Sequence, residues 1–289
     1  MTMIKLNRFL ESTLLKPTMT GSEVDLLVKE AIEEQFVGIC VPPFWVKKVR
    51  RDLGEENIQL VTVIGFPFGY TDTATKVFET KEAIRQGADE LDLVWSQTAY
   101  HSGMNWPKIE IAQIAKICHE EERILKVIIE TANLNEAQII EACLICQDAG
   151  VDFVKTSTGY ASAGAKGDHI KLMREKLSSN VGIKASGGIK TLDFALELIK
   201  AGADRIGTSS AKALMESQQD VGKAEKLIFY RALSNIHRQY HRNISQSRKW
   251  QEDQRTYQIE QEVNNGKCYG SFGFINSRNG RGDSGTDIS

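Results

Sequence analysis

The sequence lacks an excess of charge of either sign. Its 289 residues include 36 basic and 38 acidic side chains, which gives a formal net charge of −2 with the histidines neutral. Proteins that bind nucleic acid or anionic membranes through their overall field are typically strongly basic. The composition therefore predicts neither nucleic acid nor a membrane as a partner.

Long hydrophobic runs are also missing. No stretch approaches the roughly 20 apolar residues that a membrane-spanning helix needs, and the first ten residues lack the apolar segment of a secretion signal. Hydrophobic residues still make up 41% of the chain and charged residues 26%, which is typical of a globular protein with ample core.

Cysteine and histidine are scarce and scattered. The five cysteines form an odd number without a disulfide framework, which favours a reducing, cytoplasmic location. Cys143 and Cys146 form a CxxC motif, but it lies within a helical pattern and has no second half, so a packed helix face is favoured over a redox or zinc site. His101, His119 and His169 form no recognisable ligand cluster, so no metal cofactor is expected.

One sequence pattern occurs three times, around Gly87, Gly150 and Gly202. Each glycine follows an amphipathic helical pattern, where a left-handed C-cap is favoured, and each is followed by a strand pattern. The spacing between successive glycines is about that of two βα units of roughly thirty residues each. The pattern therefore indicates a repeated α-to-β connection.

Extending from these connections, we predict eight strands that alternate with helices. The strands are Phe9–Thr13, Val37–Val41, Leu60–Gly65, Glu90–Trp95, Leu125–Thr131, Phe153–Ser157, Gly182–Ser186 and Arg205–Ser209. The helices include Glu23–Gln35, which opens with a capping-box spacing at Thr20, and Thr75–Gln86, Asn135–Ala149 and Thr191–Ala201. This order predicts an α/β fold, a (β/α)8 TIM barrel over residues 1–215. A doubly wound open sheet is less favoured because no glycine-rich dinucleotide loop follows the first strand.

The chain continues beyond the predicted barrel. We expect residues 216–289 to form a C-terminal extension with one amphipathic helix, in which Leu227, Tyr230, Leu233 and Ile236 are nearly in phase, followed by a polar, disordered end. A non-enzymatic alternative is a barrel that serves as a scaffold while the appended helix binds a partner.

Two lysines and one acid are expected at the C-terminal ends of the strands, where such barrels hold their active sites. Lys155 and Lys184 lie on adjacent predicted strands, and Asp92 lies on the fourth. At an effective dielectric constant near 20, two ammonium groups about 4 Å apart repel by roughly 4 kcal/mol, enough to bring the pKa of one of them from about 10.4 to near neutrality. A neutral amine forms a Schiff base with a carbonyl, and Asp92 is placed to move protons. A structural salt bridge with Asp92 is the alternative, but two inward lysines sharing one acid favour catalysis.

A phosphate site is expected next to these residues. Gly187 and Gly188 end the seventh predicted strand, and Gly207, Ser209 and Ser210 end the eighth. Barrels often bind phosphate at these two loops. Glycine is common in turns and the serines are also suited to capping, so this evidence is weaker than the lysine pair.

Four segments in this order resemble the 2-deoxy-D-ribose-5-phosphate aldolases, a family of class I, metal-free aldolases. They are Thr13–Pro17, Glu90–Asp92, Lys155–Gly159 and Ile183–Ile189, within a similarity that runs from about Phe9 to Leu214. The resemblance implies reversible cleavage of 2-deoxy-D-ribose 5-phosphate to D-glyceraldehyde 3-phosphate and acetaldehyde, in the catabolism of deoxyribonucleosides. It assigns the Schiff base to Lys155, depression of its pKa to Lys184 and a proton relay to Asp92. A Schiff-base aldolase acting on another sugar phosphate or aldehyde is the alternative.

The resemblance also implies contacts with the substrate. It places Thr13, Cys40 and Glu11 near the sugar, with Cys40 not required as a nucleophile. The phosphate-binding positions that it implies are Gly159, Gly187, Gly188, Gly207, Ser209 and Ser210. Two residues depart from the family pattern: Glu11 replaces an aspartate, and Tyr160 stands where some relatives have a lysine.

The predicted partners are therefore a small sugar phosphate and an aldehyde, with no cofactor. A homodimer is a further possibility, because Phe44, Trp45 and Trp106 are apolar residues suited either to a dimer contact or to packing under loops.

Overall fold

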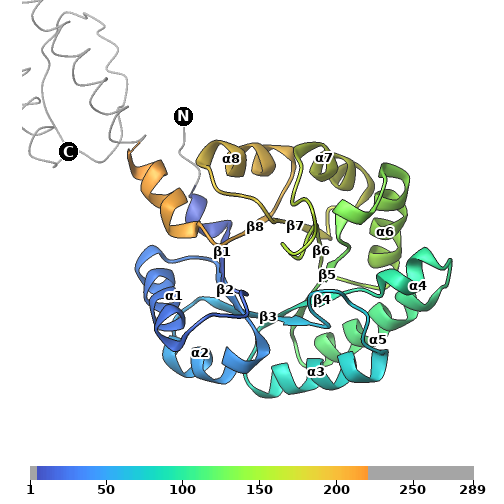
Figure 1. Cartoon of the computed structure of the whole chain (residues 1–289), viewed down its shortest axis with the longest axis horizontal. Coiled ribbons are helices and arrows are strands. Elements are labelled where there is room, and N and C mark those ends of the chain that lie inside the picture. Colours follow the sequence, from blue (N-terminus) through green and yellow to red (C-terminus); the bar gives the residue numbers. More distant parts are fainter. Residues whose placement is uncertain (1–4, 221–289) are drawn as a thin grey trace, which may run out of the picture. The chain divides into compact units, whose positions relative to one another are not determined.

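Eight parallel strands close into a single barrel with helices around the outside (Figure 1). This computed structural model describes residues 5–220 of the chain. Each strand pairs with the next in chain order, and β1 pairs with β8 to close the ring. The strands are β1 (Leu10–Thr13), β2 (Gly38–Val41), β3 (Gln59–Ile64), β4 (Glu90–Val94), β5 (Ile124–Ile128), β6 (Phe153–Lys155), β7 (Gly182–Ser186) and β8 (Arg205–Thr208). The predicted TIM barrel is confirmed.

Helices connect successive strands. They are α1 (Gly21–Glu34), α2 (Val46–Leu53), α3 (Thr73–Arg85), α4 (Gln97–His101), α5 (Trp106–Glu120), α6 (Glu136–Asp148), α7 (Gly167–Lys176) and α8 (Leu192–Ala201), with short 3-10 turns η1 (Leu6–Arg8), η2 (Pro43–Trp45) and η3 (Thr131–Asn133). None of the helices within residues 5–220 is long and apolar enough to cross a membrane.

Most strand boundaries lie within one residue of the predicted ones, but β5 and β6 end earlier than expected. Beyond β5, Glu130 adopts a left-handed backbone conformation with a φ of 53°, which interrupts an extended ladder. The chain after β6 stays attached to this segment through single hydrogen bonds, such as the one from Thr131 N–H to Thr156 O at 2.8 Å. Both strands therefore lead early into loops at the mouth of the barrel.

The local signals for helix ends are confirmed. Thr20 accepts a hydrogen bond from the backbone of Glu23 and the Glu23 carboxylate accepts one in return, the predicted capping box of α1. Gly87, Gly150 and Gly202 have φ values of 101°, 82° and 114°, the left-handed region that glycine adopts without strain. These turns set the direction in which each following strand enters the sheet.

The main hydrophobic core lies between the outer faces of the strands and the helices. Leu91 and Leu93 of β4 are fully buried in it, and so are Cys143 and Cys146 of α6, which therefore form the packed helix face that was predicted. A second, small apolar cluster consists of Cys40, Val61 and Val63, with Leu15 and Phe66 packed against it. These inward-facing residues come from β2 and β3, so the apolar part of the barrel interior lies on that side.

The predicted extension falls largely outside the described residues. Residues 211–220 are helical. The expected amphipathic helix with Leu227, Tyr230, Leu233 and Ile236 and the expected disordered end lie beyond residue 220, so the division at residue 215 and the role of the extension stay predictions.

Candidate active site

Lys155, Lys184 and Asp92 meet inside the barrel. Lys155 and Lys184 are register partners on the adjacent strands β6 and β7, and Asp92 comes from β4 across the interior. The Nζ atoms of both lysines lie 2.7 Å from the same oxygen, Asp92 Oδ2. The two amines are therefore no further apart than twice that distance, as expected from their places on adjacent strands.

The structure shows a larger charged network than the sequence predicted. Lys126 of β5 lies 3.1 Å from Asp92 Oδ1 and also forms an ion pair with Glu90. Glu11 of β1 forms an ion pair with Lys184 and lies 3.6 Å from Lys126. The three lysines and three carboxylates are at most 2% exposed. The expectation of two lysines sharing one acid is thus corrected to three lysines sharing three acids.

Arg205 of β8 closes this network on one side. Its guanidinium lies 3.9 Å from Glu11 and 3.7 Å from Glu90, and it packs over the ring of Phe153 at 5.7 Å. With every group ionised, these four cationic and three anionic side chains have one net positive charge. The network would be neutral after one amine lost its proton.

The electrostatics hold most of the network charged. Burial alone disfavours the charged form of Lys184, but the carboxylates of Asp92 and Glu11 outweigh it and raise the pKa of Lys184 above its usual value. Lys126 is likewise raised in pKa by Asp92, Glu11 and Glu90 against the effect of burial. Burial opposes ionisation of Asp92 too, yet Lys126, Lys155 and Lys184 hold its pKa well below the usual range. Lys184 therefore remains an ammonium beside an ionised Asp92.

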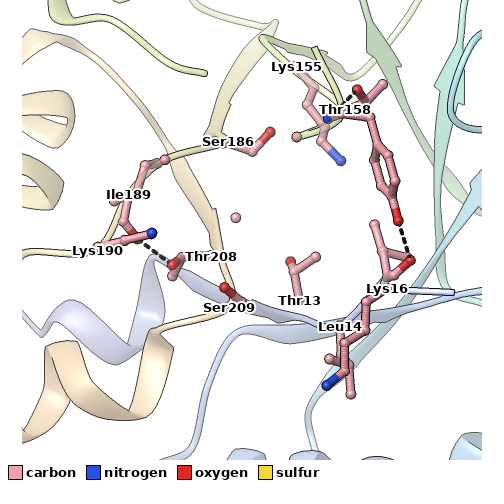
Figure 2. A pocket seen from close by; sticks show the side chains of 16 residues that line it. Thr13, Leu14, Lys16, Lys155, Thr158, Ser186, Ile189, Lys190, Thr208 and Ser209 are labelled. Atoms are coloured by element: carbon pink, nitrogen blue, oxygen red, sulfur yellow. Dashed lines mark hydrogen bonds between the residues drawn. The ribbon is translucent and has the colours of Figure 1, made fainter. Parts of the chain in front are cut away.

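A cavity of about 360 Å³ lies at the C-terminal ends of the strands. Figure 2 shows the Lys155 amine extending into this space, with Thr13, Ser186 and Ser209 around it. Of the predicted site residues, the cavity is lined by Thr13, Lys155, Gly159, Gly187, Gly188, Gly207 and Ser209. Ser210 is not in the lining, and its N–H donates to Thr208 Oγ1 at 3.0 Å.

The other predicted site residues are buried and do not line the cavity: Glu11, Cys40, Asp92 and Lys184. Glu11 is ion-paired with Lys184, and its pKa is lowered because Lys126 and Lys184 outweigh the effect of burial. Cys40 is fully buried, and burial raises the pKa of its thiol to about 11. The substrate contacts expected of Glu11 and Cys40 stay predictions.

The cavity is also lined by two lysines that were not predicted from the sequence as site residues. Lys16 is in the segment after β1 and forms an ion pair with Glu23 at 2.5 Å. Lys190 follows the glycine pair of β7 and is exposed, with no ion pair among residues 5–220. Both could have been found from the sequence, because Lys16 lies within the segment Thr13–Pro17 and Lys190 directly follows the segment Ile183–Ile189. Lys190 supplies positive charge at the cavity, where Tyr160 provides none, whereas the Lys16 amine is turned toward Glu23 and away from the cavity centre (Figure 2).

Tyr160 forms part of the wall. Its hydroxyl donates to the Leu15 carbonyl at 2.9 Å, and its ring packs edge-on against Phe66 with centroids 5.5 Å apart. It therefore joins the loop after β6 to the segment after β1 across the cavity mouth.

The turn at Gly187 depends on glycine. Gly187 has a φ of 86°, and a Cβ built on Gly164 would lie 2.1 Å from the Gly187 carbonyl oxygen. A side chain at either position would force these two loops apart. Gly187 and Gly188 both line the cavity, so this side of it is formed by backbone without side chains.

Comparisons with known proteins show which family and which solved structures the chain is similar to. A sequence profile for the family described as DeoC/LacD family aldolase matches residues 11–217. The chain is 45% identical over 217 residues to the deoxyribose-phosphate aldolase of Caldicellulosiruptor saccharolyticus, which covers 74% of this chain and 99% of that protein. It is 44% identical over 216 residues to the deoxyribose-phosphate aldolase of Thermococcus kodakarensis, with coverage of 74% and 96%. A solved structure of the deoxyribose phosphate aldolase from Aeropyrum pernix, described as tetrameric, matches with a TM-score of 0.69 at 31% identity and covers 74% of this chain and 90% of that one.

Proposed function

The chain belongs to the DeoC/LacD family of aldolases, and from this membership we propose that it reversibly cleaves 2-deoxy-D-ribose 5-phosphate to D-glyceraldehyde 3-phosphate and acetaldehyde. The observation that supports the assignment most directly is the position of Lys155. It is the lysine of the charged network that lines the cavity, and within residues 5–220 its ion pairs are with Asp92 alone. Lys126 and Lys184 each have further carboxylate partners.

Lys155 acts as the Schiff-base nucleophile. Its free amine attacks C1 of the open-chain sugar, and loss of water gives a protonated imine. A base removes the proton of the C3 hydroxyl while the C2–C3 bond breaks and its electrons flow into the imine, which leaves an enamine and releases glyceraldehyde 3-phosphate. Protonation of the enamine at C2 and hydrolysis of the imine then release acetaldehyde and restore the amine.

Asp92 and Lys184 support the proton transfers. Asp92 Oδ2 is within hydrogen-bonding distance of both amines, so it is placed to orient them and to relay protons between Lys155 and the substrate, directly or through water. Lys184 remains cationic and stabilises the ionised carboxylate. The roles assigned to the two lysines thus differ because their carboxylate partners differ.

The 5-phosphate occupies the end of the cavity formed by Gly159, Gly187, Gly188 and Ser209. Backbone N–H groups of glycine turns suit a phosphate dianion, and the amine of Lys190 adds positive charge at the same cavity. This arrangement supports a phosphorylated substrate over a free sugar.

We further propose that the enzyme is a cytoplasmic homodimer. Phe44 is 82% exposed and Trp106 49% exposed, whereas Trp45 packs partly against the core. A contact between copies would remove these apolar side chains from water.

Borohydride trapping tests the assignment of Lys155. Reduction in the presence of acetaldehyde should leave an ethyl group on the peptide that contains Lys155, found by mass spectrometry. Lys155→Met should show neither adduct nor aldolase activity, while Lys116→Met, at an exposed lysine of α5, should behave as the unsubstituted protein. Labelling at another residue, or an active enzyme that cannot be labelled, would refute the assignment.

A further inference from the structure

Glu130 is a buried acid whose position the proposed mechanism does not explain. It lies two residues after the end of β5 and is 2% exposed. Its backbone has a φ of 53°, a conformation that residues other than glycine seldom adopt. Buried carboxylates and unusual backbone conformations both oppose folding, and such features concentrate at functional sites.

The carboxylate of Glu130 binds the loop that follows Lys155. Its Oε2 accepts hydrogen bonds from the backbone N–H of Thr158, at 3.2 Å, and from the Thr158 hydroxyl. Its Oε1 is buried and has no hydrogen-bond partner among the described residues. All the hydrogen bonding of this carboxylate within residues 5–220 is therefore directed at one residue of the cavity wall.

Thr158 transmits this contact along the loop. Its hydroxyl oxygen accepts from the backbone N–H of Tyr160 at 3.1 Å, and the Tyr160 hydroxyl donates to Leu15 O at 2.9 Å. Glu130, Thr158 and Tyr160 thus connect the segments that follow β5, β6 and β1. The loop after β6 is therefore held at Thr158 by hydrogen bonds to Glu130 and at Tyr160 by the hydrogen bond to Leu15.

The same hydrogen bonds determine which backbone N–H group of this loop is left free to bind a ligand. The N–H groups of Thr158 and Tyr160 are both engaged within the protein. The N–H of Gly159, which lines the cavity at a φ of 89°, has no hydrogen-bond partner in the described part of the chain. A Cβ built on Gly159 would meet nothing within 4 Å, so open space lies beside this residue.

We propose that Glu130 is a positioning residue for phosphate recognition: through Thr158 it holds the loop so that the Gly159 N–H remains available to the 5-phosphate of the substrate. The inference rests on the proposed function. Lys155 itself is held by the β6 ladder and by Asp92, so its amine chemistry does not depend on Glu130 in the same way.

Comparison of two substrates tests this role. Glu130→Gln keeps the shape of the side chain but removes the negative charge of the carboxylate that accepts hydrogen bonds from the Thr158 N–H and hydroxyl. We expect it to lower the ratio of kcat/KM for 2-deoxyribose 5-phosphate to kcat/KM for 2-deoxyribose by at least about tenfold, mainly through KM, because hydrogen bonds to a charged acceptor are about twice as strong as neutral ones. Inhibition by inorganic phosphate should weaken by a similar factor.

A matched pair at Thr158 provides the control. Thr158→Val removes the hydroxyl without changing the shape and should lower the same ratio, whereas Thr158→Ser keeps the hydroxyl and should stay within about threefold of the unsubstituted ratio. This pair decides the question even where Glu130→Gln does not fold.

An unchanged ratio in Glu130→Gln, or equal losses on both substrates, would overturn the proposal, because either result separates Glu130 from phosphate recognition. Failure of the proposed function is seen separately. It would appear as absence of borohydride trapping or of phosphate preference in the unsubstituted enzyme.

Discussion

At the residue scale, the lysine proposed to form the Schiff base, Lys155, is distinguished by having fewer carboxylate partners than its neighbours. Lys126 and Lys184 each touch carboxylates on more than one strand, and both are raised in pKa by those partners. Lys155 shares a single oxygen of Asp92 with Lys184 and reaches the cavity. The distribution of carboxylates therefore separates the one amine that lines the cavity from two that are each held by carboxylates of more than one strand.

Glu11 should contribute to acid stability. Its pKa is lowered in the folded protein, so its share of the stability is present above the unfolded value, about 4.3, and is lost as pH falls through the lower folded value. We expect the free energy of unfolding to fall less steeply below about pH 4 in Glu11→Gln than in the unsubstituted protein. Urea unfolding at a series of pH values measures both slopes. Equal slopes would show that Lys184 and Lys126 do not bias this carboxylate.

Much of the site could be predicted from single residues, but its extent could not. Lys155, Lys184 and Asp92 stand out because each is a charge in an apolar strand pattern. Lys126 has the same signal and is the register partner of Asp92 on the adjacent strand, yet nothing local indicates that it also approaches Glu11 of β1. Such contacts depend on the closure of the ring, which brings non-adjacent strands together.

At the element scale, a second buried ion pair joins α3 to α5. Lys76 and Glu110 are at most 1% exposed and lie 2.7 Å apart, and the Lys76 amine also donates to the Val94 carbonyl at the end of β4. Burial lowers the pKa of Lys76 against the attraction of Glu110. The pair thus fastens two helices to the strand that holds Asp92.

Removal of the lysine should destabilise the protein strongly. Lys76→Met leaves Glu110 buried and unpaired, at an expected cost of about 3–5 kcal/mol in the free energy of unfolding. The double variant with Glu110→Gln should recover part of the loss because no isolated charge remains. Lys29→Met, at an exposed pair of α1, should change the same quantity by less than about 0.5 kcal/mol. Urea denaturation measures the free energy of unfolding of all three variants. A small decrease in Lys76→Met would contradict the expectation that Glu110 is left as a buried, unpaired charge.

The elements themselves were largely predictable because their signals are local. The capping box at Thr20 and the glycine at position 202 mark helix ends by chemistry that acts within a few residues. The early ends of β5 and β6 were missed, since the left-handed turn at Glu130 is stabilised by Thr158, which is distant in sequence.

At the scale of the whole molecule, the part shared with relatives is the barrel. Residues that match the Caldicellulosiruptor saccharolyticus enzyme cover 99% of that protein but only 74% of this chain. The barrel of this chain therefore corresponds to an entire relative, and the C-terminal extension is additional.

Truncation after Asp220 should leave the aldolase intact. We expect kcat/KM within about twofold of the full chain, because every residue that lines the cavity lies before the point of truncation. A twofold change is well below the 1.4 kcal/mol in activation free energy that corresponds to tenfold. Light scattering should give a mass of two chains for both forms. A large loss of activity or a change in mass would assign the extension a part in catalysis or assembly.

The alternation of side chains along the strands separates two kinds of position that can be substituted. In β4, Leu91 and Leu93 belong to the outer core while Asp92 belongs to the charged interior, and β7 repeats this with Ile183, Ala185 and Lys184. A substitution at an outward position of β4 or β7 would therefore change the packing against the helices, whereas one at an inward position would change the charge of the interior. Successive residues of a single strand can thus be varied for two separate design goals.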